Sequence, residues 1–152
     1  MMVMNPKATT KSYVYQAPLL YVAIFYVLLA AWVVLCITFL GSSFHKWGLA
    51  NLFLLFMVAF VLVHMCYFSV SISYRIEVWD EGSIQLTSFR RIIKTSAEEI
   101  PLIEGPQFPI GFIKFRLERE KAYLFCLVNN ESFKKVLSVI RAANPHMELK
   151  GL

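Results

Sequence analysis

Charged side chains are almost absent from the first half of this sequence. No Asp, Glu, Lys or Arg occurs between Ser12 and His45, and after Lys46 none occurs until Arg75. All ten acidic residues and twelve of the fifteen basic ones lie in residues 75–152. Because charged groups are costly in hydrocarbon, the first half is suited to lipid and the second to water. This distribution disfavours a single soluble domain.

Two apolar runs are long enough to cross a bilayer as helices. Residues 18–40 reach roughly 35 Å at about 1.5 Å per residue, against a hydrocarbon core of about 30 Å. Residues 49–73 form a second such run. Residues 41–48 supply glycines and polar groups, which predicts a helical hairpin with 41–48 as its outer loop. The first run is too long for a signal peptide and lacks an A-x-A cleavage site, so we expect it to be retained.

Basic residues near the helix ends predict the orientation. Lys7 and Lys11 precede the first run, several Lys and Arg follow the second, and the connecting loop carries only Lys46. We therefore expect a multi-pass protein of a bacterial inner (cytoplasmic) membrane with both termini cytoplasmic, residues 1–17 forming a cytoplasmic segment. At the inner end of the helices the aromatic belt would consist of Tyr13, Tyr15 and Tyr21. At the outer end it would consist of Phe44 and Trp47.

This orientation makes a direct prediction. Reporter fusions at Lys46 and at Leu152 should lie on opposite sides of the membrane, the second one cytoplasmic, because the Lys and Arg residues lie mainly outside the loop. An alkaline phosphatase and fluorescent protein pair at each site measures this. Both fusions on the same side would contradict two spans.

The net charge of +5 does not predict nucleic-acid binding. Residues 75–152 have twelve basic and ten acidic residues, a mixed surface of net charge +2. Such a surface supports at most a weak attraction to anionic headgroups. The cysteines, Cys36, Cys66 and Cys126, lie in three different parts of the chain, so we expect no disulfide.

After residue 74 the apolar pattern changes to the alternation of strands. Residues 74–79 and 84–88 alternate around a turn in which Gly82 can take a positive φ, which predicts a hairpin. Further strands are expected at 92–95, 102–103, 113–118 and 123–128. Residues 96–100 fit either one helical turn capped by Ser96 or a strand continuation.

A final amphipathic helix is predicted up to about Ala143, capped by Asn130 or Ser132. Its apolar stripe consists of Phe133, Val136, Leu137 and Ile140. The fold class is therefore a membrane α-helical hairpin of two transmembrane helices plus an α+β soluble domain over residues 74–152.

Short antiparallel strands closed by one C-terminal helix resemble the pleckstrin-homology-like (PH-like) fold. The features that carry the resemblance are residues 74–78 leaving the apolar run directly, the turn at 80–83, Phe89-Arg90-Arg91, and Ile100-Pro101. More particularly, the chain resembles small bacterial membrane proteins in which a PH-like domain follows two transmembrane helices. The resemblance implies an antiparallel sheet or partial barrel capped by the helix. Residues 74–152 are few for a seven-stranded sandwich, so we expect one strand to be absent or very short.

Two surface segments are candidate binding sites. The first is a basic tip with one apolar side chain, made of Phe89, Arg90 and Arg91 with Lys94 nearby. It is either a contact for anionic lipid headgroups or a simple strand turn exposed to water. Asp80 and Glu81 on the first hairpin repel phosphate, which disfavours specific inositide binding. The second segment is the irregular loop at 105–111, a candidate partner-docking loop whose residues of interest are Pro106, Phe108, Pro109 and Ile110.

His64 is the one ionisable residue deep in an apolar run. It lies about nine residues from the inner end, roughly 13 Å deep. Haem or metal ligation needs partners, yet the other histidines lie in the loop and the tail, and Cys66 is on a different helix face. We favour an intramembrane polar contact to a neighbouring helix or a backbone carbonyl.

No motif for phosphate-loop, hydrolase, zinc-protease, C-x-x-C or dinucleotide chemistry occurs in the sequence. We therefore predict no enzyme, cofactor or metal. The expected function is a non-catalytic, membrane-anchored binding or assembly module whose PH-like domain docks a partner protein or the membrane surface. The alternative is a small accessory subunit of a large respiratory, photosynthetic or transport complex, and a membrane enzyme is a third hypothesis.

Overall fold

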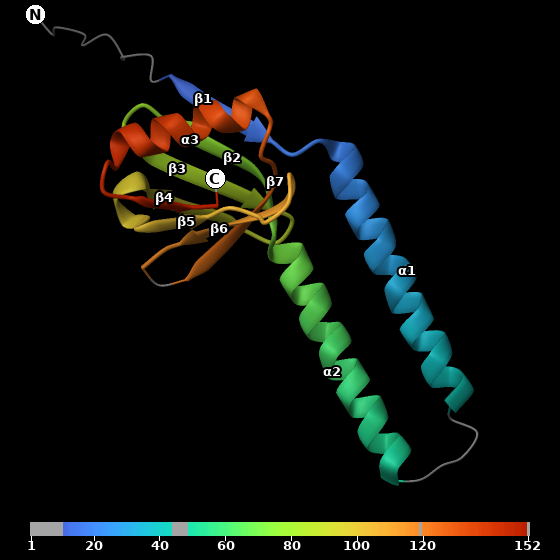
Figure 1. Cartoon of the computed structure of the whole chain (residues 1–152). Helices are drawn as coiled ribbons and strands as arrows, with labels where there is room; N and C mark the ends of the chain where they lie inside the picture. The colour runs from blue at the N-terminus through green and yellow to red at the C-terminus, as the bar shows by residue number, and fades with distance from the viewer. Residues whose placement is uncertain (1–10, 44–48, 119, 152) are drawn as a thin grey trace, which may run out of the picture.

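A computed structural model describes residues 11–43, 49–118 and 120–151. Two long helices, α1 (Leu19–Ser43) and α2 (Leu49–Ser71), extend side by side away from a sheet domain (Figure 1). Both are long and apolar enough to cross a membrane, with mean hydropathies of 2.7 and 2.3, and only 6% of either span is buried. The predicted pair of apolar helices is confirmed.

The helix ends differ slightly from the expected bounds. Residues 41–43, assigned to the outer loop, continue α1, whereas Ser73, assigned to the second apolar run, opens a strand. The side chains of Ser69 and Ser71 donate to the carbonyls of Met65 and Tyr67, four residues back, in the last turns of α2. The expected loop residues 44–48, including Lys46, lie outside the described residues.

The predicted strands are present with bounds shifted by up to three residues, whereas the first and the last strand were not expected. The strands are β1 (Ser12–Gln16), β2 (Ser73–Trp79), β3 (Ser83–Ser88), β4 (Ile92–Ser96), β5 (Leu102–Glu104), β6 (Ile110–Arg116), β7 (Lys121–Leu127) and β8 (Glu148–Lys150). Gly82 takes the expected positive φ, +84°, in the β2–β3 turn. Of the two alternatives for residues 96–100, the helical turn is correct: a 3-10 turn spans Ala97–Glu99, capped by Ser96 and Glu99.

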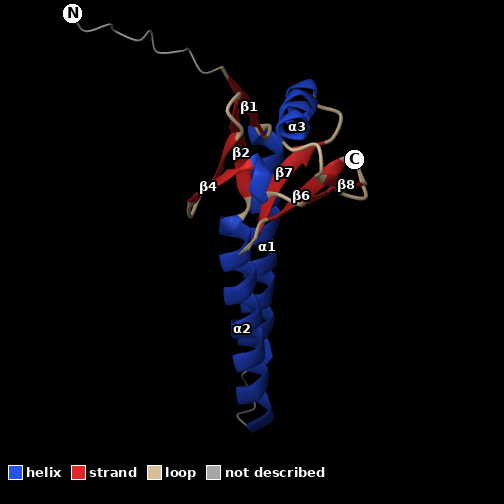
Figure 2. Ribbon diagram, turned by 90° about the vertical axis from the view of Figure 1, so that its left-hand side faces the viewer, coloured by secondary structure: helices blue, strands red, loops and turns tan. Residues whose placement is uncertain are grey.

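The sheet is mixed, which corrects the expected all-antiparallel arrangement. One antiparallel group runs β1-β2-β3-β4 and a second runs β7-β6-β5. A parallel pair, Ser73 with Leu124, joins the groups, and β8 adds to β5 in parallel. Figure 2 shows β1, β2 and β4 on one side of the sheet domain and β6, β7 and β8 on the other. The turn between the last helix and β8 is fixed by the Asn144 side chain, which donates to the carbonyls of Ala97 and Ile100 at 3.0 and 3.1 Å.

The N-terminal segment contributes a strand, so the sheet domain is not confined to residues 74–152. In β1, Ser12 pairs with Trp79 and Gln16 with Arg75. Tyr15 is 1% exposed, its hydroxyl accepts a hydrogen bond from the Leu127 amide at 3.0 Å, and its ring meets Phe133 edge-on. The assignment of Tyr15 to an aromatic belt is therefore wrong.

The last helix, α3 (Glu131–Ala143), closes the core of the sheet domain. Asn130 is its cap and accepts hydrogen bonds from the amides of Ser132 and Phe133. Of the predicted stripe, Phe133, Val136 and Ile140 are each 1% exposed, whereas Leu137 is only partly buried against the core. The predicted helix and stripe are confirmed, with Val136 nearer the core than Leu137.

Candidate functional site

The sheet rests on the ends of the two helices through an apolar cluster, here called the junction. Its buried members are Ala17, Val22, Ile72 and Phe125, with Phe25, Tyr26, Tyr74, Phe112 and Tyr123 packed around them. Side chains alternate across a strand, so Ile113 and Leu124 enter the core while Phe112 and Phe125 face the helices. Phe25 of α1 meets Phe112 at a ring-centre distance of 5.6 Å. The β6–β7 hairpin therefore packs on α1.

Hydrogen bonds fix the junction further. The Tyr26 hydroxyl donates to the Ser69 carbonyl at 2.8 Å, which links α1 to α2. The Ala17 amide donates to the Tyr74 carbonyl at 2.7 Å, where the chain leaves β1 for α1. The sheet is thus tied to both helices at the end where a bilayer surface would lie.

The predicted basic tip lies at this junction, and its arginines are engaged. Phe89 is 61% exposed, yet its ring contacts Tyr26 and Tyr74 at 5.4 and 4.8 Å. Arg90 places its guanidinium 4.0 Å from the centre of the Tyr67 ring and donates to the Ser71 hydroxyl.

Arg91 and Lys94, the other two residues of the predicted tip, have separate surroundings. Arg91 forms an ion pair with Glu120 at 2.7 Å. Lys94 lies further along β4, opposite Gln85, and borders a different hollow from the arginines. The structure therefore brings Phe89, Arg90 and Arg91 together and leaves Lys94 apart.

The strand β4 stands at one end of the sheet, so one of its edges has no strand beside it among the described residues. The Ser88 amide donates to the Arg91 carbonyl and the Ala97 amide to that of Gly82, which sets the antiparallel ladder. Because hydrogen-bonded and non-hydrogen-bonded pairs alternate, the backbone groups of residues 92, 94 and 96 point outward. Glu99 accepts from the Ser96 amide at 3.3 Å. The backbone groups of residues 92 and 94 therefore form the open edge.

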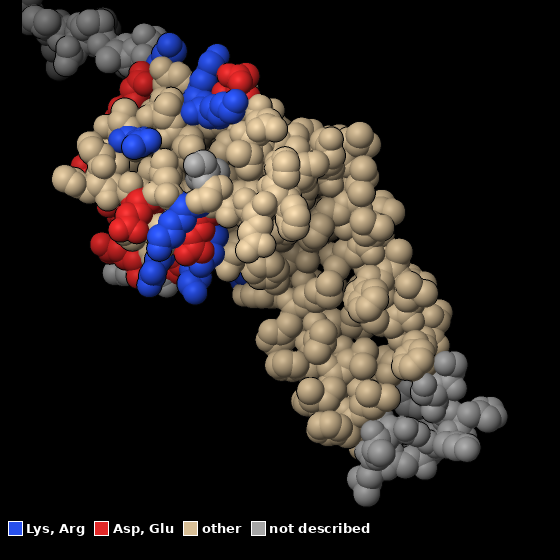
Figure 3. All heavy atoms as spheres, viewed as in Figure 1, with Lys and Arg blue, Asp and Glu red and all other residues tan. Residues whose placement is uncertain are grey.

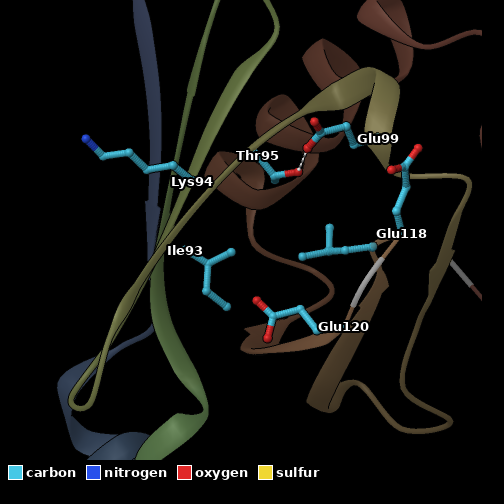
Figure 4. Close-up of a pocket in the computed structure, with 7 residues that line it drawn as sticks. Ile93, Lys94, Thr95, Glu99, Glu118 and Glu120 are labelled. Carbon is cyan, nitrogen blue, oxygen red and sulfur yellow. Dashed lines mark hydrogen bonds between the residues drawn. The ribbon is translucent and has the colours of Figure 1, made fainter.

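A hollow of about 390 Å³ adjoins this edge, between β4 and the β6–β7 turn (Figure 4). Ile93 and Leu117 form its apolar part, and Glu99, Glu118 and Glu120 bring three carboxylates to it. Glu99 is held by the Thr95 hydroxyl at 2.6 Å. Lys94 borders the hollow, but Figure 4 shows its amine pointing away. The hollow is therefore predominantly acidic.

The predicted docking loop is shorter than expected: residues 105–109 connect β5 to β6, whereas Ile110 and Gly111, which were assigned to the loop, open β6. Phe108 is 72% and Ile110 43% exposed. A Cβ on Gly111 would lie 2.6 Å from the Cβ of Pro106, so only glycine fits there. The Pro109 carbonyl accepts a hydrogen bond from the Val128 amide at 3.0 Å. A backbone hydrogen bond therefore holds the loop against β7, while the Phe108 side chain points into solvent. The docking role of the loop stays a prediction.

His64 bonds within its own helix. Its Nδ1 lies 3.1 Å from the Phe60 carbonyl, to which it donates as the corresponding tautomer, and the ring packs on Phe60 at 4.2 Å. The backbone carbonyl was one of the two expected partners. The side chain is exposed on the hairpin surface.

We expect His64→Leu to leave the packing of α1 on α2 unchanged, because the hydrogen bond it removes is internal to α2. The cost to helix association should stay below about 1 kcal/mol, the lower range for membrane polar contacts. Thermal unfolding of the full chain in detergent measures this. Loss of an absorbing cofactor on substitution would instead assign the residue a ligand role.

Potential metal ligands are dispersed over the described residues. No group of three His, Cys, Asp or Glu among them is placed to hold a metal ion. Burial raises the pKa of the Cys126 thiol to about 12, so the thiol is protonated near neutral pH and is a poor nucleophile. The Lys114 amine bonds Glu104 and lowers the pKa of that carboxyl, as in an ordinary surface ion pair.

Charged side chains on the visible face gather on the sheet domain, and the long helices α1 and α2 carry none (Figure 3). Sequence reasoning placed the tip and the loop but missed the acidic hollow, because Glu99 meets Glu118 and Glu120 only in the folded domain. Comparison of the chain with protein-family models, with curated proteins and with solved structures finds no match.

Proposed function

We propose that this chain is a non-catalytic, membrane-anchored binding module that docks a partner protein at the open edge of β4. The observation that carries the proposal is the unpaired edge at residues 92 and 94 beside the acid-lined hollow. An extended segment can add to such an edge by backbone hydrogen bonds, and side-chain pockets beside it give specificity. The geometry supports this function better than catalysis.

The charges of the hollow define the partner. Three carboxylates border it, of which Glu120 forms an ion pair with Arg91 and Glu99 accepts hydrogen bonds from Thr95 and Ser96. A segment with Lys or Arg at alternate positions would place its basic side chains over them. Lys94 in the middle of the edge disfavours pairing between copies of this strand, because charged side chains protect exposed edges. The proposed partner is therefore a different chain with a basic extended segment.

The proposal includes the placement of the domain. We propose that it is a PH-like domain on the cytoplasmic side of a bacterial inner membrane, as the basic residues around the helices suggest. Two antiparallel groups, β1 to β4 and β5 to β7, followed by α3 support the PH-like assignment. The strand β1 completes the first group, and the helical hairpin lies between β1 and β2 in the chain.

A matched pair of charge reversals tests the docking. Glu118→Lys should abolish stoichiometric co-purification of a partner from membranes in mild detergent, because it puts a like charge against the basic segment. Glu148→Lys, on exposed β8, should leave it unchanged. Lys94→Pro removes an outward amide without touching the ladder to β3 and should also abolish co-purification. A partner retained equally by all three variants would contradict docking at this edge.

The accessory-subunit hypothesis draws support from a different observation. Most of the described side chains of α1 and α2 are exposed, including Trp32, Phe53 and Phe60. Lipid or other membrane helices would cover them. If a partner complex survives Glu118→Lys but is lost when Phe53 and Phe60 are changed to alanine, association through the helices, and thus the subunit hypothesis, is favoured.

A further inference from the structure

A second hollow, of about 310 Å³, lies where the last turns of α2 meet the sheet. It is lined by Tyr67 and Ser71 of α2, by Arg90 and Arg91 of the turn between β3 and β4, and by Lys121 at the start of β7. Three chain segments distant in sequence thus converge on one concave site. Glu120 borders this hollow as well as the acidic one.

The charge of this hollow is opposite to that of the first. Three basic side chains border it, and its one carboxylate, Glu120, already forms an ion pair with Arg91 at 2.7 Å. Arg90 and Lys121 therefore remain to balance a bound anion. The buried Nε of Arg91 has no hydrogen-bond partner among the described residues, which therefore leave one donor of this guanidinium unused.

The hollow is also preorganised. The Arg90 guanidinium is held 4.0 Å from the centre of the Tyr67 ring, and its Nη1 donates to the Ser71 hydroxyl at 3.3 Å. The Arg90 amide bonds the Val70 carbonyl at 3.2 Å, which fixes the turn against α2. A guanidinium held in this way offers its remaining donors to phosphate oxygens at little further entropic cost.

The position of the hollow identifies the source of the anion. Tyr67 and Ser71 belong to the last turns of the apolar span Leu52–Ser71. In a bilayer this is the depth of the headgroups. Tyr67 and Phe68, which line the hollow beside the basic groups, are 56% and 47% exposed and offer an aromatic surface suited to an acyl chain.

We propose that this hollow binds the phosphate of an anionic phospholipid, with Arg90 and Lys121 as the principal contacts and Arg91 completing the site. The inference rests on the membrane placement of the helices and not on docking at β4. Two uncompensated positive charges favour a lipid of net negative charge over a zwitterionic one. Phe89 and Lys94 have no part in the site.

The test uses the full chain in non-ionic detergent, because a fragment without β1 lacks part of its core. Phosphatidylglycerol is titrated and the thermal midpoint of the sheet domain is followed. We expect a saturable rise with phosphatidylglycerol and little with phosphatidylcholine. Arg90→Gln with Lys121→Gln should weaken the apparent affinity about tenfold or more, since each basic contact near a membrane surface contributes about 1 kcal/mol.

Matched variants and ions control the experiment. Lys135→Gln with Arg141→Gln removes the same charge from the exposed face of α3 and should leave the affinity unchanged. Lys121→Gln alone, which disturbs no stacked group, should weaken it about fivefold and serves if the double variant unfolds. Equal stabilisation by phosphatidylcholine, or no change in the variants, would overturn the proposal. If inorganic phosphate raised the thermal midpoint in a Lys121-dependent way and lipid did not, the site would bind free phosphate. That result would also overturn the proposal.

Discussion

Val136→Asp should unfold the sheet domain while the two long helices remain. Val136 is 1% exposed between α3 and the sheet, so the substitution buries an unpaired carboxylate, and we expect a loss of more than about 4 kcal/mol. Such a loss is a large part of the stability of an ordinary domain, about 5–15 kcal/mol. Limited proteolysis and near-ultraviolet circular dichroism of the full chain measure it.

Ser138→Asp is the matched control on the same helix. Ser138 is exposed, so the same carboxylate meets water there, and the domain should keep its protease resistance. If both variants were equally stable, α3 would not close the core. Leu137, which the sequence placed on the inner stripe, is partly buried and should give an intermediate effect.

Tyr15→Ala should destabilise the domain by about 3–5 kcal/mol, the range for removing a large aromatic side chain from a core. Tyr15→Phe keeps the ring and loses only the hydroxyl that accepts from Leu127, so its cost should be about 1 kcal/mol. Chemical denaturation of the full chain in detergent separates the two effects.

Tyr13→Ala is the control for Tyr15. Tyr13 lies two residues earlier in β1 and is only partly buried against the core, so its substitution should cost less than that of Tyr15. Equal effects at the two positions would contradict the burial of β1, and with it the contribution of the N-terminal segment to the domain.

These residues also explain what the sequence could predict. The apolar spans, the alternating strands and the caps at Ser96 and Asn130 are local patterns, each readable from a few neighbouring residues. The strand β1 has such a pattern too, because Tyr13 and Tyr15 alternate with polar or exposed residues. Its place before a membrane helix favoured an aromatic belt instead. Ser12 of β1 pairs with Trp79, more than sixty residues further along the chain, and such a distant pairing leaves no signal in the local sequence.

The candidate sites follow the same division. Phe89 to Arg91 were recognisable as a basic tip because they are consecutive. The contacts of Arg90 with Tyr67 and Ser71, and of Arg91 with Glu120, depend on how the sheet rests on α2 and could not be predicted. The open edge of β4 depends likewise on strand order, a property of the whole chain.

Photo-crosslinking from the β4 edge in native membranes tests the central claim most directly. A photoreactive residue in place of Lys94 lies on the open edge, and one in place of Lys134 lies on exposed α3 and controls for chance encounters. We predict one stoichiometric adduct from position 94, to a peptide rich in Lys or Arg, absent from position 134 and lost with Glu118→Lys. No adduct from position 94, or the same adducts from both positions, would contradict docking at this edge.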